Sequence, residues 1–145
     1  MIVDGDIRLE RRIDAPADVV YAYLTDGPKW ARWQGIAVDA QPRPGGGYAV
    51  TMPNGQVASG YFVELVPNRR VVFTWGWVGD GALPPGSSTV EIELVAEGEQ
   101  TLVRLTHRGL PPPALEIHVA GWEHYLPRLA LVVTGEEAGP DALPG

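Results

Sequence analysis

The chain has 145 residues, a net charge of −7 and no cysteine, and its size and composition are those of one ordinary soluble domain. The lack of cysteine excludes disulfide scaffolds, thiolate zinc sites, iron–sulfur clusters and cysteine nucleophiles. Acidic residues outnumber basic ones 18 to 11, so the surface would repel phosphate backbones and we expect no nucleic-acid partner. There is no run of 18 apolar residues and no signal peptide, so we expect no membrane insertion and a cytoplasmic location.

The N-terminal region predicts a strand followed by two short helices. Alternating apolar residues indicate a strand over residues 7–13. Asp14 is a candidate cap for a helix over residues 17–24, whose apolar positions have helical spacing. A turn at residues 25–28 breaks this helix, and a second short helix then carries Trp30 and Trp33.

The middle of the chain predicts a β-sheet. Apolar segments are separated by turn sequences rich in Pro, Gly and Asn, which predicts six further strands near residues 36–40, 47–52, 56–66, 70–77, 88–96 and 101–107. Most connectors are short, which favours an antiparallel meander. The exception is the segment 78–88, whose Gly and Pro residues predict a long mobile loop with few apolar anchors.

The C-terminal region predicts one long helix over residues 114–134. Its apolar residues fall on one stripe at about 100° per residue: Leu115, Val119, Trp122, Leu126, Leu129 and Val133. The stripe keeps its phase across Pro127, so we expect the helix to continue with a bend near residues 123–124; the alternative is that it ends at Leu126. Residues 135–145 are polar and contain Gly and Pro, which predicts a disordered tail after a single domain of residues 1–134.

This order of elements predicts an α+β fold, with one strand, two short helices, six strands and a long helix. In such a fold the long helix covers the apolar face of the antiparallel sheet. A strongly curved sheet holds the two layers apart, so we expect a cavity between them. Its entrance is expected beside the 78–88 loop and the final helix.

Six short segments, in this order, resemble the START/SRPBCC superfamily. They are IDAP at 13–16 with the helix after it, Trp30 with Trp33, PGG at 44–46 with Tyr48, RVVFTW at 70–75, LTHRGL at 105–110, and Gly121-Trp122 with Leu126 and Leu129. Within this superfamily the sequence resembles the activator of heat-shock-protein-90 ATPase homologue family, over residues 7–134.

The resemblance implies the helix-grip fold, in which a curved antiparallel sheet wraps around a long C-terminal helix. In the superfamily the cavity between sheet and helix binds lipids, sterols, polyketides or other apolar molecules, and some members are aromatases or cyclases. The named activator engages a chaperone, which implies a stress-response role. An ATPase is not expected, because the sequence has no GxxxxGK[ST] motif and its one lysine, Lys29, follows a proline.

Aromatic residues are the main candidates for a ligand-binding site. Phe73, Trp75 and Trp77 alternate along one predicted strand, so their rings share one face. We expect them to line a pocket together with four further aromatic residues, Tyr48, Tyr61, Trp122 and Tyr125. The alternative is a filled core without a cavity.

The histidines are the second set of candidates. His107 ends a strand on the expected cavity face, His118 lies near the apolar stripe of the final helix, and His124 lies on its opposite side. The alternatives for the first two are a metal site and general acid–base catalysis, but the HExxH spacing is absent. We favour hydrogen-bonded histidines that add polarity to an apolar cavity, and we predict no metal site, no catalytic residue and no cofactor. Glu91 and Glu93 share the wet face of a strand and are expected to be solvated.

The leading functional hypothesis is binding of a small hydrophobic or aromatic ligand in the internal cavity. His107 and His118 join the seven aromatic residues as expected ligand contacts. One alternative is a cyclase, dehydratase or hydrolase acting on such a ligand, with His or Tyr as the acid–base group. Another is a co-chaperone module that binds a chaperone through its surface. The sequence leaves open whether the protein is a monomer or a homodimer.

Overall fold

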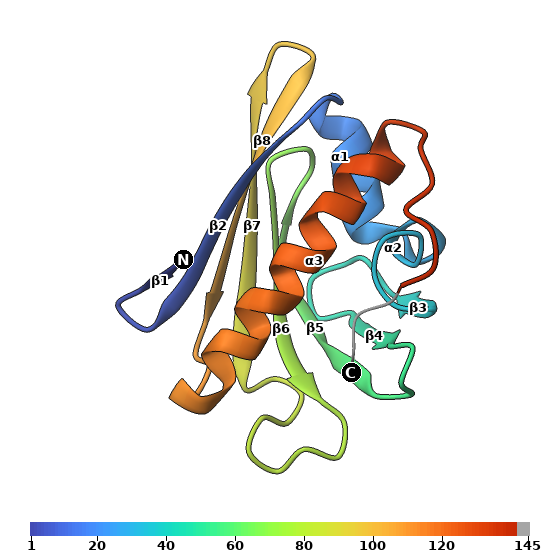
Figure 1. The fold of residues 1–145 in the computed structure, drawn as a ribbon. Helices are drawn as coiled ribbons and strands as arrows, with labels where there is room; N and C mark the ends of the chain where they lie inside the picture. Colours follow the sequence, from blue (N-terminus) through green and yellow to red (C-terminus); the bar gives the residue numbers. More distant parts are fainter. Residues whose placement is uncertain (142–145) are drawn as a thin grey trace.

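The computed structural model of the chain describes residues 1–141, in which an antiparallel sheet is covered by a long helix (Figure 1). The sheet has eight strands in the order β1-β2-β8-β7-β6-β5-β4-β3. The strands are β1 (Ile2–Val3), β2 (Asp6–Ile13), β3 (Ala37–Ala40), β4 (Gly47–Thr51), β5 (Val57–Val66), β6 (Arg70–Trp77), β7 (Ser88–Glu97) and β8 (Gln100–Arg108). The helices are α1 (Ala17–Thr25), α2 (Gly27–Trp30), the 3-10 turn η1 (Pro112–Ala114) and α3 (Leu115–Val133). The α+β helix-grip prediction is confirmed, and the short strand β1 is an addition to it.

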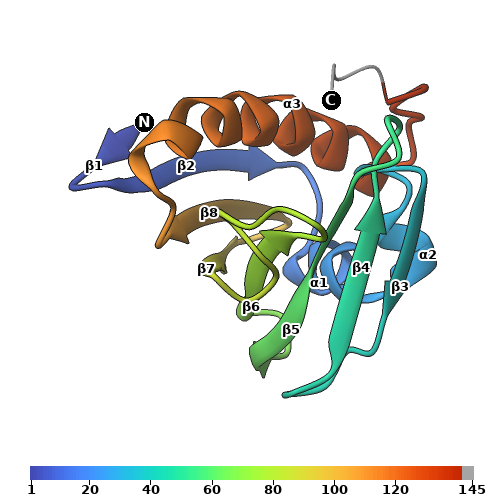
Figure 2. The ribbon, with the colours of Figure 1, turned by 90° about the horizontal axis from the view of Figure 1, so that it is seen from below.

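The sheet is strongly curved, and α3 lies along its open side (Figure 2). Strand β5 contains a register shift between Phe62 and Glu64, and such irregularities bend a strand. Near this point Gly60 lies so close to Thr74 that a Cβ at residue 60 would be 2.3 Å from the Thr74 carbonyl oxygen. Glycine therefore permits the close approach of β5 and β6 where the sheet curls.

Helices α1 and α2 fill one end of the curved sheet with aromatic side chains. The Trp30 ring stacks on Tyr48 with centroids 5.2 Å apart, and both rings pack against Phe73. Asp26 caps α2 by accepting a hydrogen bond from the Lys29 amide (3.1 Å). The expected cap at Asp14 is wrong: α1 begins after Pro16 and has no side-chain cap. Proline there supplies the required backbone angle without a capping side chain.

The outer face of the sheet carries ion pairs rather than freely solvated acids. Glu91 accepts hydrogen bonds from Arg70 (2.5 Å) and from Arg108, and its side chain is only 12% exposed. Glu93 lies 3.8 Å from Arg70. Both carboxylates lie on the solvent-facing side of the sheet, as predicted. The prediction that they are solvated is wrong for Glu91, because arginines from β6 and β8 cover its carboxylate.

Helix α3 runs through Pro127 without interruption, which excludes the alternative in which it ends at Leu126. Because the ring of a helical proline lacks an N–H donor, packing around it must compensate. The bend near residues 123–124 stays a prediction. Across the described chain, residues 1–141, no helix is both long and apolar enough to cross a membrane.

The segment after α3, residues 135–141, folds back as a strap, which we call the C-terminal strap. The buried Arg128 donates hydrogen bonds to the carbonyl oxygens of Ala138 (3.1 Å) and Gly139 (2.9 Å). The Asp141 side chain accepts one from the Gly35 amide (3.2 Å). These contacts replace the disordered tail expected for residues 135–141, because a buried guanidinium must find acceptors. The rest of that expected tail, 142–145, lies outside the described residues.

Candidate functional site

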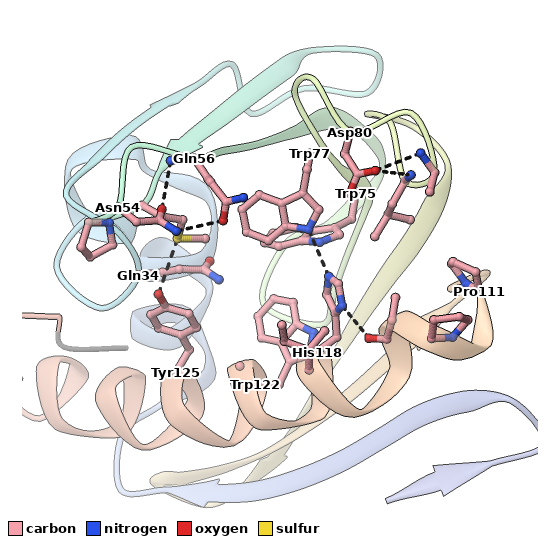
Figure 3. A pocket seen from close by; sticks show the side chains of 18 residues that line it. Gln34, Asn54, Gln56, Trp75, Trp77, Asp80, Pro111, His118, Trp122 and Tyr125 are labelled. Carbon is pink, nitrogen blue, oxygen red and sulfur yellow. Dashed lines mark hydrogen bonds between the residues drawn. The ribbon is translucent and has the colours of Figure 1, made fainter. Parts of the chain in front are cut away.

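A pocket of about 400 Å³ lies between α3 and the sheet, and we call it the α3 pocket (Figure 3). Its walls come from the first half of α3, the end of β6, the β6–β7 loop (residues 78–87) and the β4–β5 turn (residues 52–56). Pockets of roughly 300–1,000 Å³ are typical of small-molecule sites. The expected cavity between sheet and helix is therefore present, and loop residues Asp80, Ala82 and Leu83 line it, whereas the position of its entrance stays a prediction.

The central wall of the α3 pocket consists of three indole rings. The Trp75 ring lies in edge contact with the Trp77 ring, with centroids 5.5 Å apart. On another side it packs against the Trp122 ring, with centroids 5.4 Å apart. Strand alternation places Trp75 and Trp77 on one face as predicted, and α3 brings Trp122 against them. The pocket thus offers a rigid aromatic surface at little conformational cost.

Helix α3 contributes residues at spacings of four, so that one stripe faces the pocket. Ile117, Gly121 and Tyr125 follow one another along this stripe. A Cβ at Gly121 would meet no atom within 4 Å, so the missing side chain leaves part of the pocket volume open. Ile117 is 70% exposed and lies at the rim.

His118 lines the pocket and is held as a neutral imidazole. Its Nδ1 lies 2.8 Å from the Ala114 carbonyl oxygen, to which it can only donate. Its Nε2 therefore accepts the hydrogen bond from Trp77 Nε1, at 3.2 Å. Burial lowers the pKa of His118, which also favours the neutral form.

His107 lies behind the wall rather than in the pocket. Its Nδ1 accepts a hydrogen bond from Trp122 Nε1 (3.0 Å), so its Nε2 donates to Ser88 Oγ (2.9 Å). Ser88 Oγ in turn donates to the Trp75 carbonyl oxygen (2.8 Å). Burial lowers the pKa of His107 to about 3, and the neighbouring His118 adds to this. With both ring nitrogens bonded and no contact with the pocket, His107 supports the indole wall.

Polar side chains gather at the opposite end of the pocket from Asp80 (Figure 3). Tyr125 donates its hydroxyl to Asp141 Oδ2 (2.7 Å) in the C-terminal strap. Burial raises the pKa of Tyr125, and the Asp141 carboxylate raises it further. Gln34 accepts the indole N–H of Trp30 (2.8 Å), and Asn54 and Gln56 complete this end. This end is polar but offers no basic side chain.

The structure divides the nine expected ligand-contact residues into two groups. Five of them line the α3 pocket: Trp75, Trp77, His118, Trp122 and Tyr125. The other four do not line it: Tyr48, Phe73 and His107 are buried outside the pocket. Tyr61 is 49% exposed on the outer face, because its neighbour Phe62 takes the inward position of β5.

Several lining residues were missed from the sequence. Gln34 follows Trp33 in the turn after α2, where no periodic pattern indicates which way its side chain points. Met52, Asn54 and Gln56 lie in a turn whose position depends on the sheet's curvature. Over residues 1–141, no group of three or more His, Asp or Glu side chains is placed to hold a metal ion.

The family assignment rests on nearly the whole domain. The family model of the Activator of Hsp90 ATPase homolog 1-like protein matches residues 14–134. The chain belongs to this family. A comparison with the curated proteins gives no match.

Several solved structures share the fold. The AHSA1-like protein of Rhizobium etli, solved by solution NMR, is 43% identical, with a TM-score of 0.74 over 97% of this chain and 88% of that one. The crystal structure of CalU16 from Micromonospora echinospora is 32% identical, with a TM-score of 0.74 over 90% of this chain and 76% of that one. A protein described as an HSP90 activator from Plasmodium falciparum is 19% identical, with a TM-score of 0.73 over 89% of this chain and 96% of that one, and shows the fold alone.

Proposed function

We propose that this AHSA1-like protein binds a small apolar or aromatic molecule in the α3 pocket. The observation that carries the proposal is a pocket of about 400 Å³ whose centre is walled by Trp75, Trp77 and Trp122. Apolar walls with a few placed polar groups are typical of ligand sites, because the walls supply buried area and the polar groups supply orientation. The polar end around Gln34 and Tyr125 would orient the ligand.

Binding is favoured over catalysis because the candidate acid–base groups are already engaged in hydrogen bonds within the protein. A general base needs a free lone pair within reach of the substrate. Both nitrogens of His118 and of His107 are already hydrogen-bonded, and the Tyr125 hydroxyl is bonded to Asp141. None of these groups is poised for proton transfer, so we propose a binding protein of the cytoplasm, without a chemical step.

A chaperone partner is the second candidate, supported by the description of the Plasmodium falciparum relative as an HSP90 activator. Such a partner would contact the outer surface. The Aha1 protein of Colwellia psychrerythraea is described as a dimer, so the oligomeric state of this protein should be measured as well. Filling the pocket distinguishes the two candidate functions. Filling the pocket would abolish ligand binding and leave a surface contact intact.

The decisive experiment fills the pocket from α3. In Gly121→Leu the new side chain points into open volume, and replacing a helical glycine should raise helix stability by about 1 kcal/mol. Ala120→Leu is the matched control, because residue 120 is exposed and outside the pocket. The probe is the neutral dye N-phenyl-1-naphthylamine, whose fluorescence rises in apolar surroundings. We expect saturable binding by the wild type and Ala120→Leu, and at least tenfold weaker binding by Gly121→Leu; equal binding by all three would overturn the proposal.

A further inference from the structure

The α3 pocket is lined by aromatic and apolar side chains, by the uncharged polar side chains of Gln34, Asn54 and Gln56, by His118, and by one carboxylate, Asp80. No lysine or arginine is among its lining residues, all of which belong to the described part of the chain. A ligand carboxylate entering the pocket would lose its hydration without meeting a cation. The transfer of an unpaired ion out of water is among the most costly steps in binding.

The histidine of the pocket does not supply the missing positive charge. His118 donates from Nδ1 to Ala114 and accepts at Nε2 from Trp77, an arrangement that only the neutral ring can make. A protonated ring would have two donors, and Trp77 would lose its acceptor. His118 therefore stays neutral in the folded protein at neutral pH.

The start of α3 does not form an anion site either, although helix N-termini often do. Pro111, Pro112 and Pro113 have no N–H group. The amides of Ala114 and Leu115 donate to the carbonyl oxygens of Pro111 and Pro112. Three prolines and two bonded amides thus remove five of the donors that the segment 111–115 could otherwise offer to an anion.

At the far end of the pocket the nearby charges oppose one another. Arg128 affects the pKa of Tyr125 in the direction opposite to Asp141. Arg128 does not line the pocket, and its guanidinium donates to the carbonyl oxygens of Trp33, Ala138, Gly139 and Pro140. This end is therefore suited to a neutral polar group.

Asp80 lines the pocket from an exposed position in the β6–β7 loop and is held in place by that loop. Its Oδ1 accepts hydrogen bonds from the amides of Ala82 (2.9 Å) and Leu83 (3.2 Å). The carboxylate acts on His118 across the pocket, where it favours the positive form. A cationic group on a ligand would meet this carboxylate at one side and indole faces at the other, and both attract cations.

We infer that the α3 pocket selects its ligand by charge: it accepts neutral and cationic aromatic molecules, rejects carboxylates, and uses Asp80 as the specificity-determining residue. This rests on the proposed function, since it names the ligand class of the same pocket. The rejection of anions comes from desolvation that no positive charge offsets, because the unpartnered indole N–H of Trp75 in the pocket wall is a neutral donor. The preference for amines comes from Asp80 together with Trp75, Trp77 and Trp122.

Three naphthalene probes of nearly equal size test the inference by calorimetry at pH 7 and low salt. They are 2-naphthalenemethanol (neutral), 2-naphthylmethylammonium (a cation) and 2-naphthoate (a carboxylate). We expect the ammonium to bind at least as tightly as the alcohol, and the carboxylate at least tenfold more weakly. If the carboxylate binds as tightly as the alcohol, the inference is overturned while the proposed function stands. If no probe binds, the proposed function itself fails.

The role of Asp80 is tested with Asp80→Asn, whose amide oxygen can still accept from Ala82 and Leu83. We expect binding of the ammonium probe to weaken about fivefold to tenfold and binding of the alcohol to stay unchanged. Asp39→Asn, at an exposed position in the edge strand β3, removes the same charge outside the pocket. An equal loss in both variants would assign the effect to net charge and overturn the role of Asp80.

Discussion

Trp122 Nε1 donates a hydrogen bond to His107 Nδ1 at 3.0 Å, which ties α3 to β8 behind the α3 pocket. His107 Nε2 in turn donates to Ser88 Oγ, and Ser88 Oγ donates to the carbonyl oxygen of Trp75. Each donor in this chain has one acceptor, so the order of hydrogen bonds fixes the tautomer of His107. The indole wall is therefore positioned by a buried polar chain as well as by packing.

Trp122 should be sensitive to both of these contributions. Trp122→Ala removes a buried ring, and we expect it to lower the free energy of unfolding by about 3–5 kcal/mol. Trp122→Phe keeps much of the ring but leaves His107 Nδ1 without a donor, which should cost about 1–3 kcal/mol. Urea unfolding with an unchanged m-value measures both. A loss below about 1 kcal/mol for Trp122→Ala would show that the ring contributes little to the core.

His107 should make the protein less stable as the pH falls through weakly acidic values. Its pKa is about 3 in the folded protein, against about 6.5 for an ordinary histidine. The unfolded chain takes up a proton below about pH 6.5 and the folded protein does not, so stability is complete above that pH and declines towards pH 3. His118, whose pKa burial also lowers, adds a loss of the same sign.

The window between pH 6 and pH 5 separates this effect from most carboxylate titration. Between these two pH values, protonation of one histidine in the unfolded chain alone lowers the free energy of unfolding by about 1 kcal/mol. Urea unfolding of the wild type and His107→Gln at both pH values measures the share due to His107. We expect the drop to be smaller by about 1 kcal/mol in the variant, and an equal drop in both would mean that another group carries the pH dependence.

Local patterns predicted most of the fold. The strand over residues 70–77 and the helix through Pro127 follow from alternation, helical periodicity and turn chemistry, which are properties of neighbouring residues. Alternation also placed Trp75 and Trp77 on the face of the future pocket. It gives the face of a residue but not its depth, which is why Phe73 was expected in the pocket and lies behind it.

The rest of the pocket depends on contacts between residues far apart in the chain. Asp141 accepts from the amide of Gly35, 106 positions away, and no local pattern predicts such a bond. For Tyr61 the neighbouring residue decides, because Phe62 is more apolar and takes the inward position of β5. For Arg128 a signal did exist, because it follows Tyr125 by three positions and so lies on the buried side of α3.

Leu83 should anchor the β6–β7 loop, for which the sequence predicts few apolar anchors. Its side chain is buried with Ile7 and Leu110, and its carbonyl oxygen accepts from the Trp77 amide (2.8 Å). Leu83→Ala should lower the free energy of unfolding by about 2–3 kcal/mol, and it should speed the uptake of N-phenyl-1-naphthylamine in stopped-flow fluorescence. Leu131→Ala, at a partly exposed position of α3, is the control. Unchanged uptake in Leu83→Ala would place the entrance elsewhere.

Arg128 should be essential for the C-terminal strap, because one guanidinium serves four carbonyl oxygens. Nε donates to Trp33 (3.0 Å), and the other two nitrogens donate to residues 138–140. A lysine ammonium is a compact point charge and cannot span these acceptors. We therefore expect Arg128→Lys to lower the free energy of unfolding by about 2–4 kcal/mol.

The same substitution should act on the pocket through Asp141. When the strap detaches, the Tyr125 hydroxyl loses its acceptor and the polar end of the pocket loses its fixed geometry. Hydrogen exchange should then show faster exchange of the Gly35 amide, which donates to Asp141 Oδ2, and affinity for 2-naphthalenemethanol should fall in parallel. Arg11→Lys, at an exposed position, should change stability by less than about 0.5 kcal/mol. If Arg128→Lys leaves the exchange of the Gly35 amide and the affinity at wild-type values, the strap is not held by Arg128 and does not support Tyr125.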